Sequence, residues 1–170
     1  DILFNNHLFL GGDSLSPWAI NHGIQQSEIE NKEYPLWMPW IFSGMPTVHS
    51  FTDISEKYLP HHIFTALELV GFSFFWEFIF HYLLAGLGII VLLRYLKVDP
   101  FISIFSGISY LLMPYLVTMT VHGHGSQFMS TAYIPWIIWS LLKLNDSGKL
   151  HHLGLLALMV GLQLQRAHVQ

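Results

Sequence analysis

The sequence has no cysteine and few charged side chains. Without cysteine, the chain has no disulfide, no thiolate metal site and no cysteine nucleophile. Charged residues make up 11% of the 170 residues, whereas soluble proteins contain about 25%. The chain therefore lacks the charge that would solvate a globular surface. Its 7 lysines and arginines form no basic patch that would support nucleic-acid binding.

The apolar content of the chain points to a membrane. Hydrophobic residues make up 52% of the sequence, and its mean hydropathy is +0.46. No Asp, Glu, Lys or Arg occurs in residues 100–142. The chain begins without Met or a signal-like basic segment, and it stops directly after an apolar run. We expect a portion of a longer integral membrane protein, truncated at both ends.

Residues 1–58 are polar, aromatic and rich in turn-forming residues. We predict a short helix in this segment, with Ser16 as its N-cap and Pro17 at its first position. The prolines forbid one long helix: Pro17, Pro35, Pro39 and Pro46. The tryptophans suit a membrane–water interface: Trp18, Trp37 and Trp40. The segment is therefore predicted to be a structured loop that lies on a bilayer.

Residues 59–170 form the predicted transmembrane region. A short interfacial or re-entrant helix is expected at "LPHHIFTALELVG", followed by "FSFFWEFIFHYLLAGLGIIVLLRY", which is about as long as a span requires. The expected spans are residues 72–95, 101–121 with a kink at Pro114, 129–144 and 153–170. The predicted fold class is all-α: a polytopic transmembrane helix bundle with a structured extracytoplasmic loop that contains short interfacial helices.

The basic residues between the spans predict the orientation. Arg94 and Lys97 lie at the connection between the first two expected spans, and Lys143 and Lys149 lie at the connection between the last two, with Arg94 and Lys143 at the ends of their spans. Loops rich in Lys and Arg face the cytoplasm. The loop 1–58 and the "HGHGSQ" turn are therefore expected on the extracytoplasmic face.

The segment "GGDSLSP" contains a single carboxylate, Asp13, after two glycines. An acid at the outer bilayer surface can act as a general base toward a hydroxyl group. The alternative is an Asx-turn or helix-cap aspartate, which local sequence alone favours.

Two histidines, His122 and His124, stand in the glycine-containing "HGHGSQ" turn. They are candidates for binding phosphate oxygens through imidazolium hydrogen bonds. No metal site is predicted, because His-x-His lacks the third and fourth ligands that zinc requires. The alternative role is to cap two helix ends at the interface.

Further candidates lie near the C-terminal end and inside the first span. Arg166, in "QLQRAHVQ", is a candidate for binding an anionic group, because a guanidinium is always charged and matches phosphate geometry. His81 lies four residues after Glu77, a spacing at which two side chains on a helix can hydrogen bond. A haem or chlorin ligand is the alternative role of His81.

The motifs taken in order resemble a known family. The run "GGDSLSP", "PLWMPWIFSGMP", "LLAGLGIIVLLRY", "HGHGSQFMSTAYIPWIIW" and "QRAHVQ" is similar to the N-terminal part of the YfhO-type bacterial membrane proteins, which belong to the GT-C glycosyltransferase class. Order and spacing agree over nearly the whole chain. "RAHVQ" departs from the more usual Gly-His-Pro-Gln form. The resemblance implies one span before residue 1 and many more after residue 170.

The resemblance also implies an activity. It implies transfer of a sugar from a polyprenyl-phosphate carrier to an envelope glycan or lipid acceptor, at the extracytoplasmic face of the bacterial cytoplasmic membrane. Asp13 matches the position of the general base. The residues expected at the donor phosphate are His122, His124, Arg166 and His168, with Glu56, Gln127 and Gln170 in supporting roles. The sequence requires no cofactor.

Two other functions remain open from the sequence. The chain is alternatively a non-catalytic membrane subunit that binds a pigment or haem through histidine. It is alternatively a transporter for a lipid-linked sugar, which would bind with the same groups and perform no chemistry.

Overall fold

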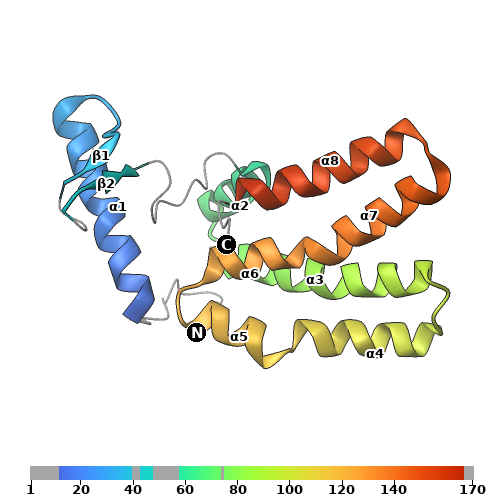
Figure 1. Cartoon of the computed structure of the whole chain (residues 1–170). Coiled ribbons are helices and arrows are strands. Elements are labelled where there is room, and N and C mark those ends of the chain that lie inside the picture. Colours follow the sequence, from blue (N-terminus) through green and yellow to red (C-terminus); the bar gives the residue numbers. More distant parts are fainter. Residues whose placement is uncertain (1–11, 40–42, 48–57, 74, 167–170) are drawn as a thin grey trace.

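The computed structural model describes residues 12–39, 43–47, 58–73 and 75–166, and it is mostly helical (Figure 1). The helices are α1 (Gly12–Asn31), α2 (Leu59–Leu69), α3 (Phe75–Tyr95), α4 (Pro100–Leu111), α5 (Pro114–Val121), α6 (Gly125–Ala132), α7 (Ile134–Ser147) and α8 (Leu150–Gln165). Two short strands, β1 (Trp37–Met38) and β2 (Met45–Pro46), pair antiparallel. The predicted helical fold is thus confirmed, and the hairpin was not predicted.

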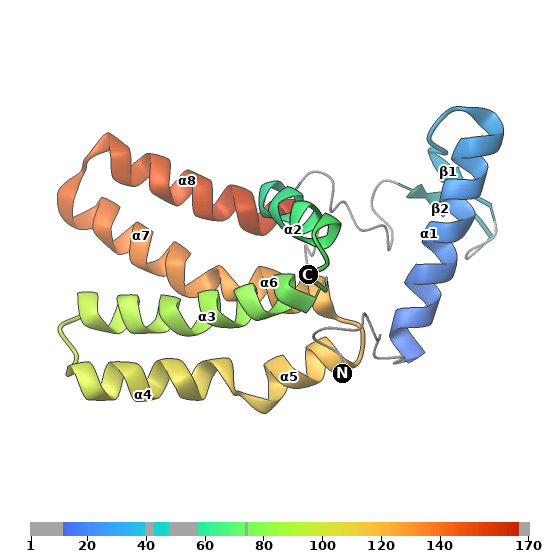
Figure 2. The same cartoon turned by 180° about the vertical axis from the view of Figure 1, so that it is seen from behind.

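The first helix begins earlier than predicted. α1 begins at Gly12, so Pro17 lies inside the helix and Ser16 is not its N-cap. Pro17 has no N–H for the carbonyl of residue 13, which weakens the first turns. The other half of α1 is stabilised by packing, because Ile20 and Ile24 are buried against Met38 of the hairpin. The helix and the strands lie apart from the other helices in both views (Figures 1 and 2).

α3 lies between its neighbours because its glycines allow close approach on two sides. A Cβ on Gly86 would lie 3.1 Å from the carbonyl oxygen of Gly107 in α4. A Cβ on Gly88 would lie 2.6 Å from Nε1 of Trp136 in α7. Trp136 Nε1 donates a hydrogen bond of 2.8 Å to the carbonyl of Leu84. Small residues at helix contacts are typical of membrane helices, which gain stability from close packing rather than from the exclusion of water.

Prolines divide two of the predicted spans. The predicted kink at Pro114 is a break, where α4 ends at Leu111 and α5 begins at Pro114. The helix expected over residues 129–144 has a break at Tyr133, where α6 ends at Ala132 and α7 begins at Ile134. Pro135 explains this break, since it has no N–H for the carbonyl of residue 131. The helix expected from residue 153 begins at Leu150.

Among the described residues, two helical segments are long and apolar enough to cross a membrane: Phe75–Tyr95 and Pro100–Val121. α8 is a shorter apolar helix. Large apolar side chains point outward from α3, α4 and α8: Phe80, Leu83, Leu87, Phe101, Phe105, Ile108, Leu153 and Leu158. Such surfaces are covered by lipid or by other protein segments rather than left in water. Together these features support membrane association.

The ends of the bundle differ in composition. The α3–α4 and α7–α8 connections, near which Arg94, Lys97, Lys143 and Lys149 cluster, lie at one end in both views (Figures 1 and 2). The α5–α6 turn and the last residues of α8 lie at the other end. This segregation matches the charge asymmetry from which the orientation was predicted.

Candidate functional site

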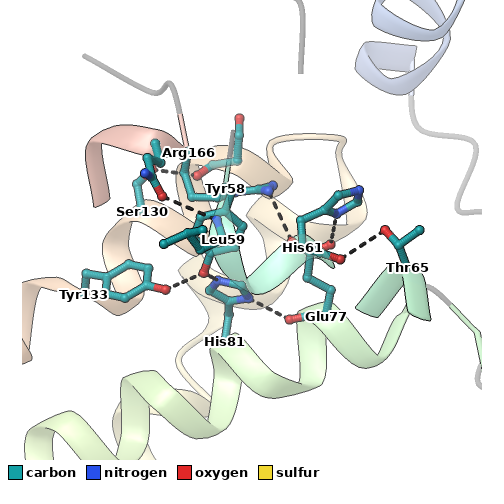
Figure 3. A network of polar contacts seen from close by, with 11 residues as sticks. Tyr58, Leu59, His61, Thr65, Glu77, His81, Ser130, Tyr133 and Arg166 are labelled. Atoms are coloured by element: carbon teal, nitrogen blue, oxygen red, sulfur yellow. Dashed lines mark hydrogen bonds and ion pairs between the residues drawn. The ribbon is translucent and has the colours of Figure 1, made fainter. Parts of the chain in front are cut away.

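A buried polar network connects α2, α3, the α6–α7 junction and the end of α8 (Figure 3). Its side chains come from positions far apart in the sequence: Tyr58, His61, Glu77, His81, Tyr133 and Arg166. They meet because the beginning of α3 and the end of α8 lie at the same end of the bundle (Figure 1). Ionisable groups inside membrane helices are costly, and they tend to mark functional sites.

Glu77 and Arg166 form the charged part of the network. Arg166 Nη1 donates a hydrogen bond of 3.1 Å to Glu77 Oε1, and both residues are buried. His61 Nδ1 lies 3.1 Å from Glu77 Oε2 and is more exposed. Arg166 also lies over the ring of Tyr58, with Cζ 4.9 Å from the ring centroid. Removing either partner of such a pair leaves an uncompensated buried charge, which costs about 3–5 kcal/mol.

One nitrogen of Arg166 is left without a protein partner. Within the described part of the chain, the buried Nε has no hydrogen-bond acceptor. Buried guanidinium donors are nearly always satisfied. We therefore expect the Nε–H to donate a hydrogen bond to a ligand or a water.

Tyr58 links His81 and Tyr133 through its hydroxyl. Its hydroxyl lies 2.7 Å from His81 Nε2 and contacts the hydroxyl of Tyr133. His81 Nδ1 donates to the backbone carbonyl of Glu77 at 2.6 Å. With a neutral imidazole, Nε2 accepts from Tyr58, so Tyr58 in turn accepts from Tyr133. Burial raises the pKa of Tyr58, and the Tyr133 hydrogen bond raises it further, so the Tyr58 hydroxyl keeps its proton.

His81 makes a contact with Glu77, as its spacing predicted, but in a different form. The i, i+4 contact with Glu77 exists, but it reaches the backbone carbonyl instead of the carboxylate. Both ring nitrogens take part in hydrogen bonds. In this arrangement Nδ1 is held by the backbone and Nε2 by the Tyr58 hydroxyl.

The histidine turn has a different structure from the network. His122 and His124 are exposed and flank Gly123, which has a positive φ of 91°. His122 Nδ1 donates to the carbonyl of Thr118 at 2.9 Å, and His122 is the C-cap of α5. A Cβ on Gly125 would lie 2.8 Å from the ring of Phe78, so glycine is needed where α6 begins. The glycines of this turn therefore have structural causes, while the exposed histidines face outward.

The remaining predicted site residues lie in separate parts of the chain, and some of them lie outside the described residues. Asp13 lies in the first turn of α1, and its role stays a prediction. Gln127 donates to the hydroxyl of Tyr115 at 3.3 Å. Arg166 forms an ion pair with the Glu77 carboxylate, and its binding of a donor phosphate stays a prediction. Glu56, His168 and Gln170 lie outside the described residues.

Sequence reasoning did not assign Tyr58, His61, Glu77 and Tyr133 to a common site. The one available signal was Glu77, an acid within an apolar span. Among the described residues, no group of three or more His, Cys, Asp or Glu side chains is arranged to hold a metal ion.

The fold and the network define a mostly helical protein with two segments capable of spanning a membrane and a buried ion pair at one end of its bundle. No protein-family model matches the chain, and searches of curated proteins and of solved structures find no match either.

Proposed function

We propose that the chain is part of a multi-pass membrane glycosyltransferase that moves a sugar from a polyprenyl-phosphate carrier to an extracytoplasmic acceptor. The resemblance of the ordered motifs to the YfhO-type proteins supports this proposal. The structural observation that carries it is the position of Arg166. Arg166 is buried, and its Nε has no acceptor among the described residues. It directly follows α8, whose last residues lie at the same end of the bundle as the α5–α6 turn with His122 and His124 (Figure 1).

The location suits a carrier lipid. A polyprenyl phosphate keeps its phosphate at the level of the lipid headgroups, so the chemistry has to take place at the edge of the bilayer. The last residues of α8, which Arg166 follows, lie at the end of the bundle opposite the α3–α4 and α7–α8 connections, beside which Arg94 and Lys149 stand in the sequence (Figures 1 and 2). By the positive-inside rule, the Arg166 end faces away from the cytoplasm.

The proposed reaction is a direct displacement at the anomeric carbon. The Asp13 carboxylate takes the proton of the acceptor hydroxyl as that oxygen bonds to the anomeric carbon. The bond from the anomeric carbon to the phosphate oxygen breaks, and the configuration of the sugar inverts. The leaving phosphate gains negative charge, which Arg166 and the histidines His122 and His124 stabilise. His168, Glu56, Gln127 and Gln170 complete the proposed site.

The test uses the full-length protein and a supplied polyprenyl-phosphate sugar. Asp13→Asn keeps the size of the side chain and removes its basicity, so transfer should fall by about 100- to 10,000-fold, with donor binding nearly unchanged. Glu28→Gln is the matched control, because Glu28 is an exposed acid on the same helix. Wild-type transfer by Asp13→Asn would refute the general-base role. Donor binding without transfer in the wild type would instead indicate a lipid-linked sugar transporter.

A further inference from the structure

Within the described part of the chain, the guanidinium of Arg166 is contacted at Nη1 and across one face. Glu77 accepts from Nη1, and the Tyr58 ring covers the face of the group. In an arginine, the Nε–H bond and one N–H bond of Nη2 point in the same direction from one edge of the guanidinium. This edge can donate two hydrogen bonds to two oxygens of a phosphate. Nε has no protein acceptor within the described residues although it is buried.

We infer that Glu77 is the positioning residue of the donor site: it fixes Arg166 through Nη1 and leaves the Nε–Nη2 edge to the phosphate of the carrier lipid. This inference rests on the proposed function and adds a role for Glu77. The carboxylate is suited to this role because α3 holds it rigidly. Glu77 lies in the first turn of α3, is buried, and receives a second contact from His61 on α2.

The length of the carboxylate side chain offers a mild way to test the inference. Glu77→Asp keeps the negative charge that compensates Arg166, but it withdraws the carboxylate by one methylene. Displacing a positioning group by about 1 Å can cost about 100-fold. We expect the affinity for a polyprenyl monophosphate to fall at least about tenfold in the full-length protein, with unchanged affinity for the uncharged polyprenol. Glu68→Asp is the matched control, because Glu68 is an exposed acid on α2.

A double-mutant cycle separates positioning from a general effect on the fold. If Glu77 acts through Arg166, Glu77→Asp should have no further effect on phosphate affinity once Arg166 is replaced by Lys, which cannot present the Nε–Nη2 edge. An equal loss with and without Arg166 would overturn the inference. The inference would also be overturned if Arg166→Lys weakens phosphate binding but Glu77→Asp does not. The proposed function would survive that result. Unchanged binding in both variants would overturn both proposals.

A second measurement needs no variant and therefore does not depend on refolding. In the wild-type protein, polyprenyl monophosphate should shift the ¹⁵N and ¹H resonances of the Arg166 Nε–H group, and polyprenol should not. A phosphate that binds without moving this resonance would exclude contact with the Nε edge and overturn the inference.

Discussion

Gly86 and Gly107 bring the backbones of α3 and α4 into contact, since a Cβ on Gly107 would lie 2.8 Å from the carbonyl oxygen of Gly86. The same Cβ would lie 2.5 Å from Cγ1 of Ile90. A side chain of any size at residue 107 therefore pushes the two helices apart, because the carbonyl oxygen belongs to a rigid helix backbone.

The first prediction concerns this contact. Gly107→Ala should destabilise the protein by about 1–3 kcal/mol, the usual cost of overpacking, measured as a lower thermal midpoint in detergent. Gly154→Ala is the matched control, because nothing lies within 4 Å of a Cβ at residue 154 in α8. Its midpoint should be unchanged or higher, since Ala is the better helix former. Equal midpoints for the two variants would contradict the packing described for α3 and α4.

The second prediction concerns topology. A cysteine at Ser126, near the beginning of α6, should react with a membrane-impermeant maleimide added to intact cells. A cysteine at Asn145, an exposed position near the end of α7, should react only after the membrane is opened. The chain has no native cysteine to add background. Labelling of residue 126 from the cytoplasm alone would reverse the proposed orientation.

The third prediction concerns the hydroxyl of Tyr58. Tyr58→Phe deletes the group that contacts both His81 and Tyr133, and it leaves two buried polar partners unsatisfied. The free energy of unfolding should decrease by about 1–3 kcal/mol. Tyr34→Phe is the control, because Tyr34 is exposed. A loss of the same size in the control would show that the network does not stabilise the fold.

The fourth prediction concerns alkaline pH. Burial raises the pKa of Tyr58 above the ordinary value of 10.0. Below pH 10 both folded and unfolded chains keep the phenol proton, so Tyr58 adds no pH dependence. Above that pH only the unfolded chain loses the proton, so stability should fall as the pH rises from about 10 to 11. Thermal midpoints across this range should fall less steeply in Tyr58→Phe, and an identical slope would contradict the raised pKa.

The helices were largely predictable from local sequence. The apolar run before Arg94 predicted a span over residues 72–95, and α3 occupies Phe75–Tyr95. Pro114 predicted a kink, and the structure has a break between two helices there. The break at Tyr133 was missed, because hydropathy averaged over a window does not register the missing N–H of Pro135. The start of α1 was also missed. Local sequence does not show the tertiary packing of Ile20 and Ile24 on Met38, which stabilises this helix.

The network was hardly predictable. Arg166 was recognised as an anion-binding side chain, but its partner Glu77 lies 89 residues earlier. Periodicity assigns faces to a helix without specifying which faces meet. Tyr58 and Tyr133 carry no local pattern that distinguishes them from the interfacial tyrosines of any membrane helix.

The separation of Glu77 from Arg166 also has a consequence for how the chain is made. At about 5–20 residues per second, roughly 5 to 20 s pass between synthesis of the acid and of its arginine, given their 89-residue separation. In the membrane arrangement proposed above, α3 enters the bilayer with its carboxylate before the compensating charge exists. Glu77 lies in the first turn of α3, so its carboxylate lies near the lipid headgroups during this time. His61 contacts Glu77 in the folded chain and is synthesised before it. This histidine is therefore present to bind the Glu77 carboxylate before Arg166 is made.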